Sequence, residues 1–305
     1  MAKNALIFAD GKLGVGLGHI SRCRALQAEL ELLGFQVELK DTQELEANLG
    51  NILLDLIAID SYVLPLKSYE QAVKCAKVCL FFDDALRLSY PKAILLNNAS
   101  CVNFVKYKEK YPHHILFLGS DYRLLQPPFI EALKSPTIPL KQKVQNVLIT
   151  LGGKDILSLN KPLIMALREA YPHLNLHCIT KDSTLAKQGV KVYFDLSAQE
   201  MVDLIQQMDL CICACGQSLG EILACGIPAI ALEVASNQKA NLESFSSCIL
   251  SVSKSYLLPR DSICNQVLKY FCILTSLALR KTHQKCALEI LNRPTKWKES
   301  LEKIF

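Results

Sequence analysis

The chain has 305 residues, 50% of them hydrophobic and 21% charged, which is typical of globular domains and excludes a disordered or fibrous protein. This length predicts two domains. The formal net charge is only +5, and no run of lysines and arginines is interleaved with aromatic residues. We therefore expect no nucleic-acid partner and favour an anionic small molecule.

The 13 cysteines are an odd number without paired spacing, which is typical of small buried side chains in a reducing compartment. The first ten residues do not have the pattern of a signal peptide. No apolar run reaches the roughly 18 residues that a membrane helix needs. These features predict a cytoplasmic protein without stable membrane insertion.

Short apolar runs alternate with helical or polar segments through the first half of the chain. The predicted strands are 5–10, 35–39, 55–60, 77–84, 93–98 and 114–119. A helix is expected from the glycine-rich segment to about Leu33. Continuous apolar runs with polar ends are typical of a parallel sheet covered on both faces.

The segment 126–145 holds four prolines and interrupts this alternation, so we place the domain boundary there. Strands are predicted again at 146–153, 174–180, 190–195, 209–216, 228–233 and 248–252. The residues from about Arg260 to Phe305 are predicted to be helical, with a break near Pro294. The fold class is therefore α/β, with two doubly wound, Rossmann-like domains, 1–142 and 143–305.

Three alternating glycines, Gly14, Gly16 and Gly18, connect the first predicted strand to the first helix. Glycines allow close backbone approach, and the first N–H groups of a helix attract anions. The spacing is not G-x-G-x-x-G, and no acidic residue follows the second strand in the dinucleotide position. A nicotinamide dinucleotide is disfavoured, and we expect no cofactor.

His19 follows these glycines in the first turn of the predicted helix. The positive end of a helix disfavours imidazolium, so a neutral ring there could accept a proton. The alternative is a ring that only caps the helix or packs. Arg22 falls one turn later on the same face, from where it could reach a ligand anion.

A second candidate anion site follows the strand 209–216, where Gly216 leads into a helix that begins near Gln217 and Ser218. Glu221 lies one turn further and could accept hydrogen bonds from ribose hydroxyls, or it could simply favour the helix dipole. Three further candidates end neighbouring strands or their loops, and each could instead be an ordinary turn or loop residue. They are Gly153, Asn237 and Gln238.

Two groups of residues resemble metal or acid–base sites, but their spacing argues against both roles. Cys211, Cys213 and Cys215 share one face of a strand about 6.6 Å apart, too far for three Zn–S bonds of about 2.3 Å, so we expect core packing. Adjacent Asp83 and Asp84 point to opposite faces at a strand end, so they are not a catalytic carboxylate pair. We expect no metal.

The segment Gly16–Cys23, G-x-G-H-x-x-R-C, resembles the opening motif of the UDP-sugar hydrolases of pseudaminic acid biosynthesis. Further matches follow in order from Asp10 to about Asn241. They are Asp60-Ser61-Tyr62, Asp83-Asp84 with Arg87, Asn97-Asn98, Leu118–Phe129, Leu151–Asp155 and Ala214–Gln238. This chain departs from the family pattern at Phe8, where an arginine is common, and at Gln217, Leu219 and Gly220.

The resemblance implies a GT-B fold, with two Rossmann-like domains facing a cleft and UDP held mainly by the second. It implies hydrolysis of a UDP-linked diacetamido trideoxy altrose to UDP and the free sugar, without a metal and with inversion at the anomeric carbon. His19 would be the general base. We expect Asp10 to orient the His19 ring, and Tyr90 and Asn237 to position the sugar.

Two alternatives remain at this stage: a UDP-sugar glycosyltransferase of the same fold, and a nucleotide-sugar binding protein without catalysis. The expected partner is in each case a UDP-sugar, and we expect a monomer.

Overall fold

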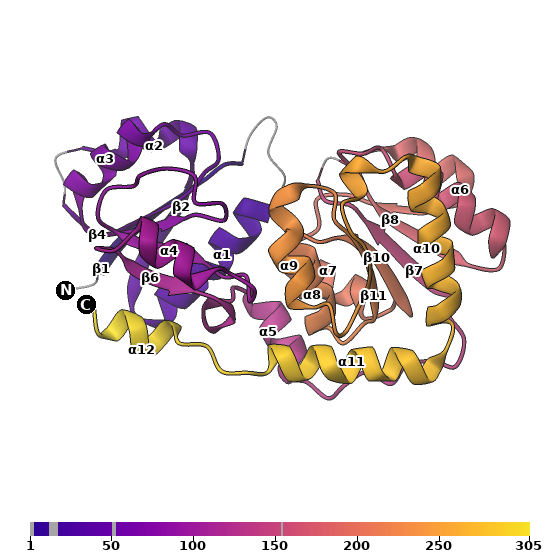
Figure 1. Cartoon of the computed structure of the whole chain (residues 1–305). Coiled ribbons are helices and arrows are strands. Elements are labelled where there is room, and N and C mark those ends of the chain that lie inside the picture. Colours follow the sequence, from indigo (N-terminus) through magenta and orange to yellow (C-terminus); the bar gives the residue numbers. More distant parts are fainter. Residues whose placement is uncertain (1–2, 12–17, 51–52, 154) are drawn as a thin grey trace. The chain divides into compact units, whose positions relative to one another are not determined.

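The computed structural model describes residues 3–11, 18–50, 53–153 and 155–305, and the chain divides into two compact units. The first unit contains Met1–Gln126 and Pro294–Phe305, and the second contains Pro127–Arg293. Each unit is built around one six-stranded sheet whose strands are all parallel (Figure 1). The predicted α/β class with two doubly wound sheets is confirmed. The expected boundary between residues 142 and 143 lies inside the second unit.

The first sheet has the strand order β2-β1-β3-β4-β5-β6. Its strands are β1 (Lys3–Ala9), β2 (Phe35–Asp41), β3 (Leu54–Asp60), β4 (Ala76–Phe82), β5 (Ile94–Asn97) and β6 (Ile115–Leu118). The chain continues from β1 to β2 on one side and then returns to β3 on the other side. The carboxyl ends of β1 and β3 therefore flank the point where the strand order reverses, which is where open α/β sheets bind ligands.

Helices of the first unit bury apolar side chains against this sheet. They are α1 (Gly18–Leu32), α2 (Leu45–Asn48), α3 (Leu66–Cys75), α4 (Phe104–Lys110) and α12 (Trp297–Glu302). In α1, Cys23, Leu26 and Leu30 recur at helical spacing and pack in one core cluster with Ile7 and Ala58 of the sheet. The opposite face of the sheet packs against Tyr69 of α3.

The C-terminal helix α12 belongs to the first unit although it is far from that unit in sequence (Figure 1). The Trp297 side chain is buried, and its indole N–H donates to the carbonyl oxygen of Arg123 at 3.1 Å. The indole also contacts Phe117 and Tyr122 edge-on, with ring centroids 5.7 and 5.5 Å apart. The tail from Pro294 onward therefore completes the core of the first sheet.

Replacing Trp297 with alanine is expected to destabilise the first unit by about 3–5 kcal/mol, because the substitution leaves a large cavity and an unpaired carbonyl. Urea unfolding followed by tyrosine fluorescence would measure this loss. The matched control is Lys298→Ala on the same helix, since the Lys298 side chain is 80% exposed. Equal stability of the two variants would contradict the prediction.

The second sheet has the strand order β12-β11-β10-β7-β8-β9. Its strands are β7 (Asn146–Thr150), β8 (Asn175–Ile179), β9 (Lys191–Tyr193), β10 (Leu210–Ala214), β11 (Ala229–Leu232) and β12 (Leu250–Val252). Here β7 is followed by β8 and β9 on one side, and the chain returns to β10 on the other. The carboxyl ends of β7 and β10 thus flank the reversal point of this sheet.

The helices of the second unit are α5 (Pro127–Lys134), α6 (Asn160–Ala170), α7 (Ala198–Ile205), α8 (Gln217–Ala224), α9 (Lys239–Ser244), α10 (Arg260–Leu274) and α11 (Leu277–Leu291). Two of them, α5 and α9, were not predicted from the sequence. Pro127 and Pro128 open α5, where proline is tolerated because the first N–H groups of a helix have no partner within it. Since α5 packs against α7 and α8, the second unit begins earlier than the proline content suggested.

Within the described ranges, no single helix is long and apolar enough to cross a membrane. The pair α10 and α11 meets that criterion by length and composition only when the two are taken together, and they are bent by 98°.

Candidate functional site

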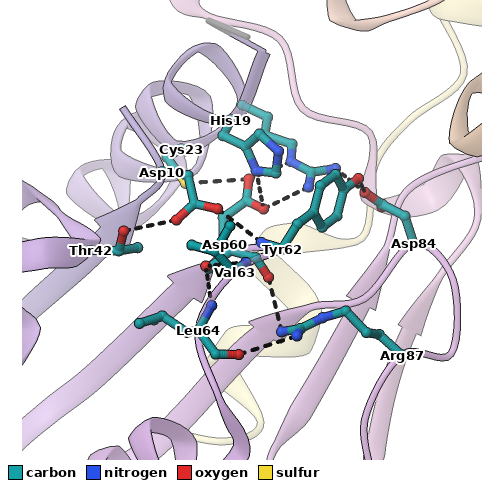
Figure 2. Close-up of polar contacts among 12 residues, drawn as sticks. Asp10, His19, Cys23, Thr42, Asp60, Tyr62, Val63, Leu64, Asp84 and Arg87 are labelled. Atoms are coloured by element: carbon teal, nitrogen blue, oxygen red, sulfur yellow. Dashed lines mark hydrogen bonds and ion pairs between the residues drawn. The ribbon is translucent and has the colours of Figure 1, made fainter. Parts of the chain in front are cut away.

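A histidine–aspartate pair lies at the carboxyl ends of β1 and β3 (Figure 2). His19 is in the first turn of α1, and its Nδ1 lies 2.6 Å from Oδ1 of Asp60, the last residue of β3. The Asp60 side chain is fully buried. An ionised carboxylate accepts hydrogen bonds, so we assign the proton to Nδ1, which makes Nε2 the nitrogen with the lone pair. The pair is therefore arranged to accept a proton at Nε2.

Arg22 holds the same carboxylate from the next turn of α1. Its Nε donates to Oδ2 of Asp60 at 2.5 Å and its Nη2 donates to Oδ1 at 2.6 Å, while Nη1 donates to Oδ2 of Asp84 at 2.8 Å. Burial alone would raise the pKa of Asp60, but the Arg22 charge and the His19 hydrogen bond outweigh it and lower that pKa. Burial would likewise lower the pKa of Arg22, but Asp60 and Asp84 raise it.

The network has an unbalanced charge that suits a base. Asp60 and Asp84 carry two negative charges and Arg22 carries one positive charge, so these three residues together carry −1. A proton taken by His19 neutralises this charge. The expected contact between Arg22 and a ligand anion is not supported, because the guanidinium is already occupied by both carboxylates and its carbon lies 4.7 Å from the centre of the Phe82 ring.

Tyr62 connects Asp84 to His19. Its hydroxyl donates to Oδ2 of Asp84, and its ring packs edge-on against His19 with the centroids 4.5 Å apart. Asp60, Tyr62 and Asp84 lie in the motifs shared with the family, but the sequence indicated no role for them. Their positions were the available signal, because each lies at the end of one of the neighbouring strands β3 and β4 or within two residues after it.

The segment that carries Tyr62 is fixed by polar contacts on both sides. Arg87 donates to the carbonyl oxygens of Ser61 and Leu64, each at 3.1 Å. Asp10 accepts from the Tyr62 N–H and from the Thr42 hydroxyl, each at 2.8 Å.

The expectation that Asp10 orients His19 is wrong, since Asp60 does so. In the parallel register Asp60 pairs with Ala9, which lies on the α1 face of the sheet. Asp10 is one residue further along, and successive residues of a strand point to opposite faces. The same rule confirms that Asp83 and Asp84 diverge, because Asp83 is buried and accepts from the Tyr111 hydroxyl at 2.8 Å.

Tyr90 also differs from expectation. Its side chain is only 5% exposed and packs against Tyr69 and Phe81, with ring centroids 4.9 and 5.8 Å apart. This core position does not support a contact with a sugar. Of the glycine loop, Gly14 and Gly16 lie outside the described residues, while Gly18 opens α1 and is exposed. A Cβ added to Gly18 would have no atom of the described residues within 4 Å.

In the second unit, several predicted residues lie at the carboxyl ends of β7 and β10. Gly216 follows β10 and precedes α8 without a side-chain cap, and Ser218 is partly exposed in the first turn. Glu221 is in the second turn and is 5% exposed. Gly153 follows β7, after Gly152, whose φ of +82° requires glycine or a strained residue. A helix amino end without a side-chain cap is a position at which an anion can bind.

The loop after β11 approaches the same helix end. The Gln238 side-chain oxygen accepts from the Val234 N–H at 3.0 Å, and its nitrogen lies 3.7 Å from where a Cβ on Gly216 would be. The structure therefore brings Gln238 to the start of α8, next to Gln217. The neighbouring Asn237 is exposed. From the motif Leu151–Asp155, Asp155 instead caps α6 through the N–H groups of residues 159 and 160.

The three alternating cysteines of β10 and its end are completely buried, which confirms core packing. Burial raises the pKa of each thiol. In the described part of the chain, no group of three or more His, Cys, Asp or Glu side chains is arranged to hold a metal ion.

Two doubly wound parallel sheets with these reversal points define the GT-B glycosyltransferase fold class. No family model matches the chain. It is 28% identical over 253 residues to the pseudaminic acid cytidylyltransferase and UDP-2,4-diacetamido-2,4,6-trideoxy-beta-L-altropyranose hydrolase of Helicobacter pylori. The match covers 79% of this chain but 46% of that protein, so this chain spans about half of that relative's length.

Two other proteins that resemble this chain also belong to carbohydrate biosynthesis or sugar transfer. The spore coat polysaccharide biosynthesis protein SpsG of Bacillus subtilis is 24% identical, with 92% of this chain and 91% of that protein covered. The solved structure of the spinosyn rhamnosyltransferase SpnG with thymidine diphosphate superposes with a TM-score of 0.61 at 14% identity, over 98% of this chain and 100% of that one. The chain thus resembles proteins that process sugar nucleotides.

Proposed function

We propose that this protein hydrolyses a UDP-linked 2,4-diacetamido-2,4,6-trideoxy sugar to UDP and the free sugar. The observation that carries the proposal is the His19–Asp60 hydrogen bond at the reversal point of the first sheet. The second support is the similarity over 79% of the chain to a relative whose name includes this hydrolase activity.

In this proposal His19 is the general base. Its Nε2 removes a proton from a water molecule that attacks the anomeric carbon, and the buried Asp60 stabilises the imidazolium that forms. The C–O bond to UDP breaks as the new C–O bond forms, so a single displacement inverts the anomeric centre. UDP leaves with its charge already delocalised. We therefore propose that neither a metal ion nor protonation of the leaving group is required.

The second unit would hold the UDP. The amino end of α8, with Ser218 in its first turn, would receive the phosphates. Glu221 would accept hydrogen bonds from the ribose hydroxyls, and the amides of Asn237 and Gln238 would contact the phosphate or the acetamido groups.

The decisive experiment is incubation of the purified protein with the UDP-linked diacetamido altrose sugar in the presence of EDTA and without an acceptor. We expect UDP and a free sugar whose first-formed anomer, seen by proton NMR, is inverted. Bound but uncleaved substrate would contradict the proposal. An acceptor screen would then separate a glycosyltransferase from a binding protein without catalysis.

Replacing Glu221 with glutamine is expected to weaken UDP binding by about 10–100-fold, because charge-assisted hydrogen bonds contribute about 1.5–3 kcal/mol. Calorimetry with UDP would measure the affinity. Glu200→Gln is the matched control, since Glu200 lies on α7 and caps that helix by bonding Ser197. Unchanged UDP affinity in Glu221→Gln would contradict the assignment of the ribose site.

A further inference from the structure

Asp84 occupies a position in the network that the proposed reaction does not yet use. Its Oδ2 accepts both from Arg22 Nη1, at 2.8 Å, and from the Tyr62 hydroxyl (Figure 2). Its side chain is 14% exposed. Arg22 in turn holds Asp60, Asp60 holds His19, and the Tyr62 ring packs on His19. The contacts therefore form a closed ring with the base on one side and Asp84 on the other.

We propose that Asp84 is a positioning residue that fixes Tyr62 and Arg22 around the His19–Asp60 pair. This inference rests on the proposed role of His19 as the base and deepens it. Asp84 need not touch the substrate, because its effect reaches His19 through Tyr62 and Arg22.

The positioning effect follows from the geometry. The backbone of Tyr62 is already fixed by Asp10, so the remaining freedom is rotation of its side chain. The hydrogen bond to Asp84 removes that freedom and keeps the ring edge-on to His19, at an interplanar angle of 84°. The His19 ring is then held by two contacts, the hydrogen bond to Asp60 and the packing of the Tyr62 ring. Together these contacts set the direction of His19 Nε2.

The first test measures kcat for UDP release and UDP affinity in Asp84→Asn. We expect kcat to be about tenfold lower with UDP affinity retained, because the amide holds the Tyr62 hydroxyl and Arg22 less firmly than the carboxylate does. In Asp121→Asn, the control, both quantities stay unchanged, because Asp121 pairs with Lys296 elsewhere in the same unit. An unchanged kcat in Asp84→Asn would overturn the positioning role.

The second test separates position from charge. Asp84→Glu keeps the charge but displaces the carboxylate by one methylene, so we expect a kcat about tenfold lower, with UDP affinity retained. Full kcat in Asp84→Glu would overturn the positioning role. Glutamate also provides a charged variant should the asparagine variant fold poorly.

Failure of this inference is distinguishable from failure of the proposed function. If the wild-type protein releases no UDP from the sugar nucleotide, the hydrolase proposal fails. If the wild-type protein is active and its kcat does not respond to either substitution of Asp84, only the present inference fails.

Discussion

Replacing His19 with alanine should reduce UDP release from the sugar nucleotide by about 10²–10⁴-fold while UDP itself binds with unchanged affinity. The reason is that catalysis and UDP binding are proposed to depend on residues of different units. His19 belongs to the first unit, whereas the residues proposed to hold UDP, at the amino end of α8, belong to the second. The loss should therefore appear in kcat and not in the UDP dissociation constant.

Single-turnover release of UDP and calorimetry with UDP would measure these two quantities on the same preparations. Because the His19 side chain is mostly buried, circular dichroism must show that the variant is folded. Ser21→Ala, two residues along α1, is a useful companion, since Ser21 Oγ accepts from Gln126 at 3.0 Å. Turnover of His19→Ala at the wild-type rate would remove His19 from the mechanism.

Replacing Asp60 with asparagine should damage both stability and catalysis. The fully buried carboxylate holds His19 and the Nε–Nη2 edge of the Arg22 guanidinium, so its loss leaves a largely buried positive charge without its main partner. Breaking such a pair costs about 3 kcal/mol or more. The His19 ring also loses the acceptor that selects its tautomer, so kcat should fall by about 10²–10⁴-fold.

The stability effect has a defined pH dependence. The folded protein lowers the pKa of Asp60, so the carboxylate stabilises the fold above its unfolded pKa of about 3.9, and this contribution is lost as the pH falls through the lower folded value. Urea unfolding at pH 6 and at pH 3 should show a wild-type advantage over Asp60→Asn that shrinks in acid. Asp121→Asn, which breaks an exposed ion pair, should cost about 0.5 kcal/mol or less. A difference between wild type and Asp60→Asn that does not depend on pH would contradict this account.

The strands were predictable because each is a continuous buried run, and a parallel sheet covered on both faces requires this pattern. For β10, all five residues are buried, and its core position was clear from sequence. Helices α2, α3 and α4 were not predicted, and α2 and α4 are short helices with a single buried residue each. Helix α5 was hidden by its prolines.

The sequence predicted at which edge of the sheet the candidate site lies, but it did not predict which side chains contact each other there. The alternation of strand and helix placed His19 beside the ends of the first and third strands. Asp60 ends β3 and Asp10 directly follows β1, and only the register of Ala9 opposite Asp60 decides which carboxylate faces α1. Tyr90 was misplaced for a related reason, because its burial depends on contacts with Tyr69 and Phe81 from distant parts of the chain.

The return of α12 to the first sheet has a consequence for the order in which the protein can mature during synthesis. All residues of the second unit lie between Pro127 and Arg293, so its core can form as soon as that stretch has emerged from the ribosome. The first unit begins the chain but needs Trp297 to close its core. The half that is translated first is therefore completed last, and until then it would expose the apolar surface around Phe117 and Tyr122 that chaperones recognise.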